Sequence, residues 1–316
     1  MRPTLSPLAL ALAALMLGAC TPASQDATAD AAKAGAAAPA TSEAAPNASA
    51  AAAPAQSPAD PLDAILAGDW RDPANAARDA FRHPRETLAF FGVGPSQTVI
   101  EISPGGGWYT EVLAPLAQGK GRYIGALNDP AKASSERATE YHTKANQGFR
   151  DKLAARADVY GNASVVEVDP AAPVFGEAGS ADVVLTFRNV HNWVGAGSET
   201  AMFKGFYDVL APGGVLGVVE HRAAAGTTME EVKASGYLPE DYVIGLATAA
   251  GFVLQEKSEV NANPADTKDH PNGVWTLPPG NRHDDADKTK YAAIGESDRM
   301  TLRFVKPQAA AETAAP

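Results

Sequence analysis

The pattern of apolar and polar residues along this chain alternates between short apolar runs and longer segments whose apolar residues recur at helical spacing. The apolar runs predict seven strands, over residues 99–102, 122–127, 164–168, 182–187, 215–220, 252–260 and 300–306. The segments over 69–91, 108–117, 131–157, 198–210 and 240–250 predict helices. This alternation predicts an α/β fold with a doubly wound, mostly parallel seven-stranded sheet and an insertion, residues 261–299, before the last strand.

Two of the helical segments carry local signals of their own. Ser198 is expected to cap the helix that follows it, because a serine side chain can accept a hydrogen bond from a free N–H of the first turn. Basic residues crowd the segment 69–91, namely Arg78, Arg82, His83 and Arg85. We expect them to form a solvated helix face, with direct ligand contact as the alternative.

The N-terminal residues predict export rather than a part of the fold. Arg2 precedes an apolar run over 5–17, and residues 17–20 have the form of a lipobox that ends at Cys20, the only cysteine. We therefore expect a lipoprotein signal peptide over residues 1–19, a lipid on Cys20, and a location in the cell envelope, facing the periplasm. An ordinary secretory signal is the alternative.

Composition divides the remainder into a tether, one domain and a tail. Residues 20–59 are almost wholly Ala, Pro, Ser and Thr, which predicts a disordered tether, and residues 307–316 predict a disordered tail. Residues 60–306 are enough for one α/β domain with a sizeable core. The 26 basic residues are outnumbered by 37 acidic ones without a basic cluster, which argues against nucleic-acid binding.

A glycine turn, Gly105-Gly106-Gly107, follows the first predicted strand and precedes a helix. Glycines there let the backbone approach a ligand closely, which predicts a site for a nucleoside-containing small molecule. Thr110 stands where a dinucleotide fingerprint needs its third glycine, and Gly119-Lys120 lacks the Ser or Thr of a P-loop. Both of those phosphate-binding motifs are therefore excluded.

The segment from Glu101 to Gly107 instead resembles the acidic-x-Gly-x-Gly-x-Gly motif of the class I S-adenosylmethionine-dependent methyltransferases. The turn over residues 212–214 is similar to the one those enzymes carry before their fifth strand, and the final strands flanking an insertion resemble their antiparallel end. The strings over 101–110 and 295–302 resemble an uncharacterised bacterial family of predicted methyltransferases. The resemblance implies a Rossmann-like fold and S-adenosylmethionine as the cofactor.

The resemblance also implies cofactor contacts at particular positions. Gly105 and Gly107 would lie beneath the methionine and ribose, Glu101 would act on the amino group, and Asp169 matches the position that often binds adenine. Two positions depart from the family pattern. Ser103 replaces the first glycine, and Leu127 stands where an acidic residue usually holds the ribose, so that Asn128 or Asp129 would take that role after a small shift.

Candidate catalytic residues follow the fourth predicted strand, in a predicted loop over residues 188–193. Arg188 is a candidate to hold an anionic substrate group, His191 to act as a base, and Asn192 to orient the acceptor. Purely structural roles for this segment are the alternative. Asp269, His270 and Trp275 lie in the insertion and predict a lid, and Glu296, Asp298 and Arg299 predict either a pocket lining or a surface ion network. The spacing of these residues matches no dedicated metal site, so none is expected.

Two functions remain open from the sequence. The first is a membrane-tethered methyltransferase that acts on a small molecule or an envelope component. The second is a non-catalytic envelope lipoprotein that uses the same fold as a binding or scaffold module, favoured by Leu127 and by the cytoplasmic origin of the methyl donor. The acceptor and the oligomeric state are left open.

Overall fold

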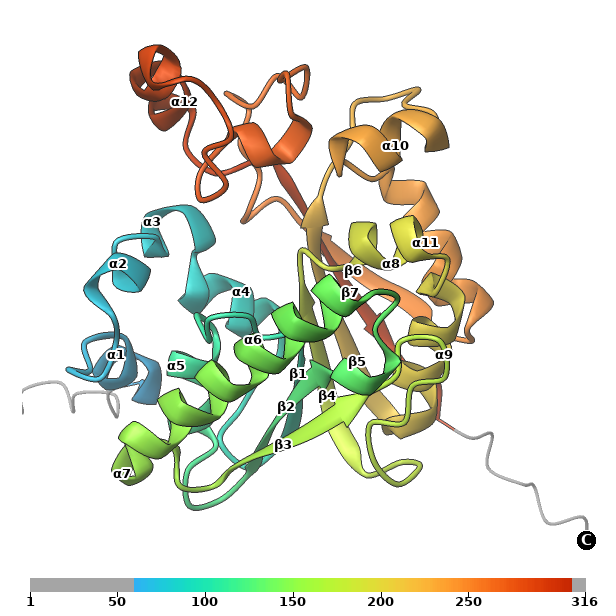
Figure 1. Ribbon diagram of the computed structural model, residues 1–316. Helices are drawn as coiled ribbons and strands as arrows, with labels where there is room; N and C mark the ends of the chain where they lie inside the picture. The colour runs from blue at the N-terminus through green and yellow to red at the C-terminus, as the bar shows by residue number, and fades with distance from the viewer. Residues whose placement is uncertain (1–59, 309–316) are drawn as a thin grey trace, which may run out of the picture. The chain divides into compact units, whose positions relative to one another are not determined.

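The computed structural model describes residues 60–308 (Figure 1). The predicted signal peptide, Cys20, the tether up to residue 59 and residues 309–316 of the predicted tail lie outside the described residues. Within residues 60–308, no helix is both long enough and apolar enough to cross a membrane.

All seven predicted strands are present and form one sheet in the order β3-β2-β1-β4-β5-β7-β6. Their bounds are β1 Thr98–Ile102, β2 Arg122–Asn128, β3 Ala163–Val168, β4 Ala181–Phe187, β5 Leu210–His221, β6 Val253–Ser258 and β7 Arg299–Val305. Strands β3, β2, β1, β4 and β5 pair in parallel, and β7 pairs antiparallel with both β5 and β6. The predicted doubly wound, mostly parallel sheet is confirmed.

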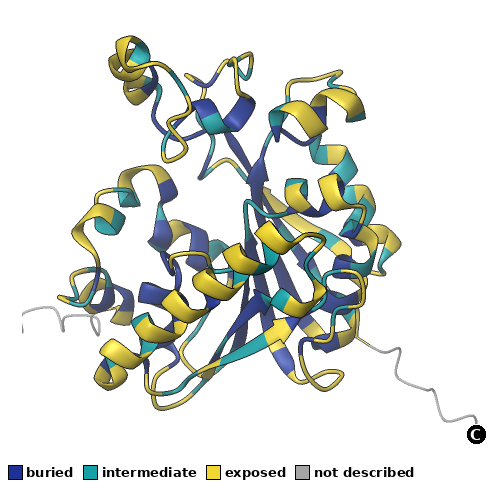
Figure 2. Cartoon of the chain, viewed as in Figure 1, coloured by how far each residue is buried: buried dark blue, intermediate teal, exposed yellow. Residues whose placement is uncertain are grey.

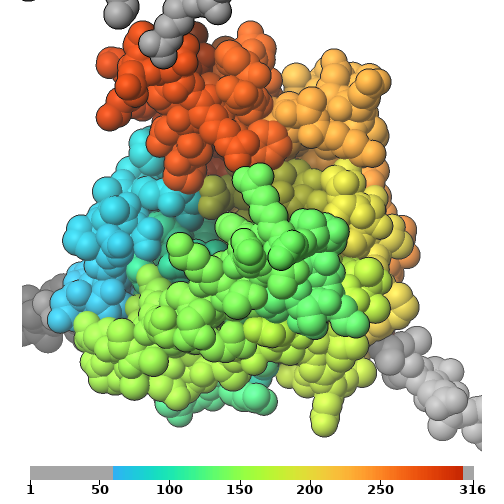
Figure 3. Space-filling model, in the orientation of Figure 1, coloured from blue at the N-terminus to red at the C-terminus, as the bar shows by residue number. Residues whose placement is uncertain are grey.

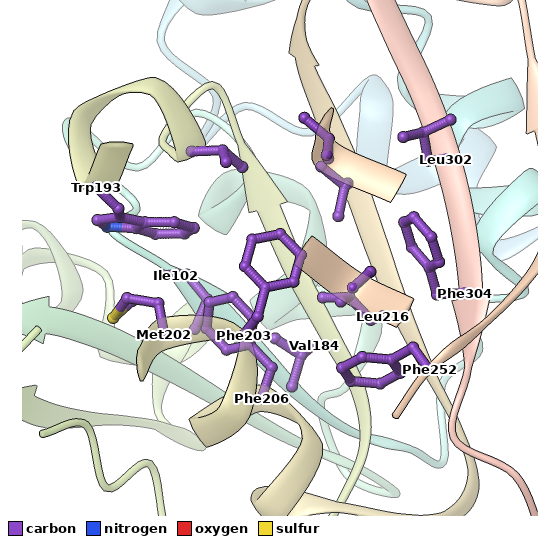
Figure 4. Close-up of a cluster of buried hydrophobic side chains, with 14 of the residues drawn as sticks. Ile102, Val184, Trp193, Met202, Phe203, Phe206, Leu216, Phe252, Leu302 and Phe304 are labelled. Atoms are coloured by element: carbon purple, nitrogen blue, oxygen red, sulfur yellow. The ribbon is translucent and has the colours of Figure 1, made fainter. Parts of the chain in front are cut away.

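Helices cover both faces of the sheet because alternate strand residues point in opposite directions. In β4, Val183 and Leu185 belong to the apolar cluster packed by α4 (Pro84–Phe91), α5 (Thr110–Leu116) and α6 (Glu136–Ala155). Val184 belongs to the cluster packed by α8 (Val190–Ala196), α9 (Glu199–Val209) and α11 (Glu240–Ala249). Figure 4 shows Val184 and Leu216 of the sheet beside Phe203 and Phe206 of α9. The central strands β1, β4, β5 and β7 are accordingly mostly buried, whereas the edge strands β3 and β6 and the outer faces of the helices are more exposed (Figure 2).

The helices that the sequence predicts are present, with several more. The helices before β3 are α1 Pro61–Leu66, α2 Pro73–Ala76, α3 Asp79–Arg82, α4 Pro84–Phe91, α5 Thr110–Leu116, α6 Glu136–Ala155 and α7 Ala157–Tyr160, with a 3-10 turn, η1, at Pro130–Lys132. The later helices are α8 Val190–Ala196, α9 Glu199–Val209, α10 Met229–Ser235, α11 Glu240–Ala249 and α12 Lys288–Ile294, with 3-10 turns η2 Gly273–Thr276 and η3 Asp285–Asp287.

Two local predictions about the helices are wrong. The segment after β4 is a loop only as far as Asn189, because α8 begins at Val190. The N–H groups of Val190 and His191 are satisfied by Glu220 at the end of β5, a capping group that local sequence does not reveal. Ser198 precedes α9, but its hydroxyl makes no capping hydrogen bond.

The insertion between β6 and β7 lies at the carboxyl edge of the parallel strands. This follows from topology: β6 runs in the same direction as β5, so the chain leaves β6 and re-enters β7 at that edge. In Figure 1 the red-orange insertion faces the N-terminal helices α2 and α3 across this edge. Ligands of open α/β sheets bind at the carboxyl ends of strands, so the fold brings both segments to the expected site.

Candidate functional site

Two adjoining cavities lie at the carboxyl edge of β1, β2 and β4, and they share Ser103, Gly105 and Asn189. The larger, of about 640 Å³, extends over the ends of β2 and β3 and along α6, and the smaller, of about 240 Å³, extends toward α2 and α3. Figure 3 shows the surface hollowed where the N-terminal segment, α6 and the insertion meet. The larger volume suits a ligand of cofactor size.

The glycine turn forms the boundary between the two cavities. Gly105 and Gly107 have φ values of 59° and 80°, and a Cβ added to Gly105 or Gly106 would meet no protein atom within 4 Å. The turn therefore presents bare backbone to open space, as a ligand lying over it requires. Ser103, which replaces a glycine of the motif, adopts φ 49°, a left-handed conformation that an L-residue adopts at some energetic cost.

Glu101 is the buried acidic residue of this turn. It is 2% exposed, and its Oε2 accepts hydrogen bonds from Thr110 Oγ1 at 2.9 Å and Tyr123 Oη at 2.6 Å. Glu101 also lines the smaller cavity, and its Oε1 has no hydrogen-bond partner among the described residues. Burial raises the pKa of Glu101 to about 7, against the opposing effect of the two hydroxyl donors.

The residues predicted to hold ribose and adenine are brought together in the larger cavity. Leu127, Asn128, Asp129 and Asp169 all line it. Oδ1 of Asp129 accepts from the N–H of Ala131, and Oδ1 of Asp169 accepts from the N–H of Ala171, so each carboxylate uses one oxygen for its own turn. The apolar Leu127 remains the departure from the family pattern, and a polar ligand in this cavity must use its neighbours.

The three candidate catalytic residues are placed differently from one another. Asn192 lines the larger cavity, and Arg188 lines the smaller one with a backbone φ of 62°. His191 is in neither lining. Its Nδ1 lies 3.0 Å from Glu220 Oε1, and its ring lies 6.1 Å from that of Trp275 in the insertion. The catalytic role of each stays a prediction.

His191, Glu220 and His221 form a compact group in which possible metal-ligating atoms lie within 4.8 Å of one another. Both oxygens of Glu220 are already occupied: Oε2 accepts from the N–H groups of Val190 and His191, and Oε1 accepts from the N–H of His221 and contacts His191 Nδ1. His221 Nδ1 lies 2.5 Å from Ser297 Oγ. This hydrogen bonding fits a carboxylate that positions α8 and the His191 ring.

The basic residues of segment 69–91 separate into two environments, so the solvated-face prediction is only partly right. Arg85 is the solvated one and pairs with Asp60 and Asp63. Arg82 is 3% exposed, and both Arg78 and Arg82 line the smaller cavity and bind Glu296 of the insertion. Glu296, Asp298 and Arg299 line neither cavity, and the expected surface network is instead buried.

Several residues that line the cavities were not predicted as site residues from the sequence. Asn189 lines both cavities, and its Nδ2 donates to the carbonyl of Ile102 and to Thr186 Oγ1, which ties the end of β1 to β4. The sequence could have indicated Asn189 as a site residue, because it follows Arg188 at the carboxyl end of a strand. Trp108, Tyr109 and Phe187 form the aromatic lining of the smaller cavity. The local sequence around these three aromatic residues does not distinguish them from ordinary core residues.

The residues present fit S-adenosylmethionine at this site. The larger cavity has the volume, the turn has bare backbone, and residues with unpartnered polar atoms line the two cavities. Ser198 lines the larger cavity, and its buried Oγ makes no hydrogen bond to any described residue. Glu101 lines the smaller cavity, and its Oε1 makes no hydrogen bond to the described residues. A hydrogen-bonding ligand would supply the missing partners.

Comparison with solved structures finds similar folds at low sequence identity. The [4+2]-cyclase SpnF is 16% identical over 73% of this chain and 82% of its own, with a TM-score of 0.50. An S-adenosylmethionine-dependent methyltransferase from Aquifex aeolicus is 15% identical over 74% of this chain and 94% of its own, with a TM-score of 0.47. One from Methanosarcina mazei is 10% identical over 70% of this chain and 97% of its own, also with a TM-score of 0.47. No protein-family model matches the chain, and no curated protein matches it.

At these identities the likeness shows the fold alone. The sheet order, with β7 antiparallel between β5 and β6, is the one that the resemblance to class I methyltransferases implies. SpnF is named as a cyclase, so this architecture alone does not specify methyl transfer. The function depends on the residues of the site.

Proposed function

We propose that this protein is an S-adenosylmethionine-dependent methyltransferase, tethered to the membrane by a lipid on Cys20, which acts on a small molecule or an envelope component. The observation that carries the proposal is the open glycine turn beside Glu101, between two cavities that share Ser103, Gly105 and Asn189. S-adenosylmethionine would supply a methyl group on a sulfonium, a centre open to displacement.

The residues of this chain would chiefly bind and align the two reactants. The larger cavity would take the adenosine, with Asn128, Asp129 and Asp169 as its polar contacts. The amino group of the methionine part would lie against Glu101, and the acceptor would enter the smaller cavity beside Arg188. If Nδ1–H of His191 donates to Glu220, its Nε2 is free to accept a proton.

Calorimetry with S-adenosylhomocysteine, the demethylated product, tests the cofactor directly. We expect saturable binding to the full-length protein purified in detergent. No binding at millimolar ligand would contradict the proposal and favour the alternative, a non-catalytic binding module, for which Leu127 in the larger cavity is the supporting observation.

Cofactor affinity is expected to depend on the charge of Glu101. Since the pKa of Glu101 is raised to about 7, the carboxylate takes up a proton as the pH falls through 7 and loses its attraction for an ammonium group. Binding of S-adenosylhomocysteine should therefore weaken about tenfold from pH 8 to pH 6.

Glu101→Gln is the matched control for this pH dependence, since it should bind weakly and without the change between pH 8 and pH 6. 5′-Methylthioadenosine lacks the amino-acid part and should bind the wild-type protein equally well at both values. Equal pH dependence of both ligands would show that Glu101 does not contact the amino group.

The tether is tested by labelling cells with a lipid precursor. We expect label on the wild-type chain and none on Cys20→Ala, with the labelled protein in the membrane fraction. An unlabelled protein that stays in the cytoplasm would contradict the tether while strengthening the enzymatic proposal, because the methyl donor is made there.

A further inference from the structure

The smaller cavity is lined by three arginines from two segments that are distant in sequence. Arg78 immediately precedes α3, and Arg82 is the last residue of α3. Arg188 comes from the turn after β4. We call this cavity the arginine pocket. Arg299, at the start of β7, is also buried and pairs with Glu296, as Arg78 and Arg82 do.

Protein carboxylates balance only part of this positive charge. Glu296 binds Arg78 at 2.7 Å, Arg82 at 3.2 Å and Arg299 at 3.0 Å, so a single carboxylate serves three guanidinium groups. The second carboxylate is Glu101, whose Oε2 is held by two hydroxyl groups.

Donors remain unused in the arginine pocket. The Nη2 atoms of Arg78 and Arg82 are buried without a partner, and Arg188 makes no side-chain hydrogen bond to the described residues. Burial, together with neighbouring arginines, lowers the pKa of both Arg82 and Arg188, as expected where positive charge is crowded and incompletely compensated. Unpaired buried guanidinium donors are costly, and an anionic ligand would satisfy them.

The remaining walls are aromatic. Tyr109 and Phe187 stack with ring centroids 3.5 Å apart and an interplanar angle of 11°, and the Arg82 guanidinium lies 4.7 Å from the centre of the Trp108 ring. Such walls favour a planar or apolar body beside the charged group. The volume of about 240 Å³ admits only a small ligand.

The cofactor accounts for part of this chemistry. The methionine part of S-adenosylmethionine carries one ammonium and one carboxylate, so these two groups balance and can engage Glu101 and one arginine. The positive charge of the other arginines in the pocket is not balanced by the cofactor. We propose, building on the proposed function, that the arginine pocket is the acceptor subsite and that the acceptor is a small molecule carrying a carboxylate or phosphate group, held by Arg82 and Arg188.

Anion binding to the full-length protein tests this proposal, with benzoate and inorganic phosphate as probes. Calorimetry is performed on protein saturated with S-adenosylhomocysteine, so that the cofactor's own carboxylate is already in place. We expect benzoate to bind the wild-type protein, and Arg188→Gln to weaken that binding at least tenfold. Arg85→Gln, which removes a partly exposed arginine paired with Asp60 and Asp63, should bind benzoate like the wild type.

Two results would overturn the proposal. One is equal benzoate and phosphate binding by wild type and Arg188→Gln. The other is competition of both anions with S-adenosylhomocysteine but not with 5′-methylthioadenosine, which would assign the arginine pocket to the cofactor's carboxylate. If the protein binds no S-adenosylhomocysteine yet binds benzoate in an Arg188-dependent manner, the proposed function fails while the anion pocket is supported.

Discussion

Replacing Gly105 with leucine is expected to reduce binding of S-adenosylhomocysteine at least a hundredfold while the protein remains folded. A Cβ at Gly105 meets no protein atom within 4 Å, so the new side chain would project into the space between the two cavities. The positive φ of 59° adds a backbone cost of about 1–2 kcal/mol, which a domain of this size can tolerate. Calorimetry measures the affinity, and urea unfolding monitored by circular dichroism measures the stability.

Gly119→Leu is the matched control for this substitution. Gly119 also has a positive φ, 85°, and a Cβ added there would likewise meet no protein atom within 4 Å, but it precedes the amino end of β2 and lines neither cavity. We expect a similar loss of stability and unchanged ligand binding. Equal loss of binding in both variants would mean that backbone strain, rather than occupation of the site, weakens the affinity.

Replacing Glu296 with glutamine is expected to lower the free energy of unfolding by about 3–5 kcal/mol, as when one partner of a buried ion pair is removed. Glutamine keeps the size of the side chain but removes the charge that Arg78, Arg82 and Arg299 share. Urea unfolding at pH 7 measures the change. Glu259→Gln is the control, because Glu259 pairs with Arg222 at the surface, where its side chain is 69% exposed, and should cost less than about 1 kcal/mol.

The effect of Glu296 should also depend on pH in a defined direction. Burial acts to raise the pKa of Glu296, but the surrounding arginines lower it from 4.5 to about 2. A lowered pKa in the folded state stabilises the protein above pH 4.5, and this contribution is lost as the pH falls toward 2. The difference in stability between wild type and Glu296→Gln should therefore be constant from pH 7 to 5 and shrink below pH 4.5. A difference that stays constant down to pH 3 would contradict the ion-pair explanation.

The strands, the longer helices and the fold class followed from the sequence because they depend on short-range patterns. A strand buried on both faces must be apolar over consecutive residues, so runs such as Val183–Leu185 are visible without any knowledge of their neighbours. The turn at Gly105 was visible for a similar reason, since its positive φ favours glycine. These signals predicted the seven-stranded sheet and the carboxyl end of β1 as the site.

The charges of the site were decided by the tertiary structure alone. Arg82 and Arg85 lie in one segment with the same local composition, yet Arg82 is buried against Glu296 and Arg85 is solvated. Arg82 and Glu296 are 214 residues apart, and they meet because antiparallel β7 returns the insertion to the edge where β1 and β4 end. Burial and pairing of a charge depend on what packs against it from elsewhere in the chain. For this reason the sequence by itself determined the sheet and its glycine turn, and only the folded chain brought the arginine pocket together.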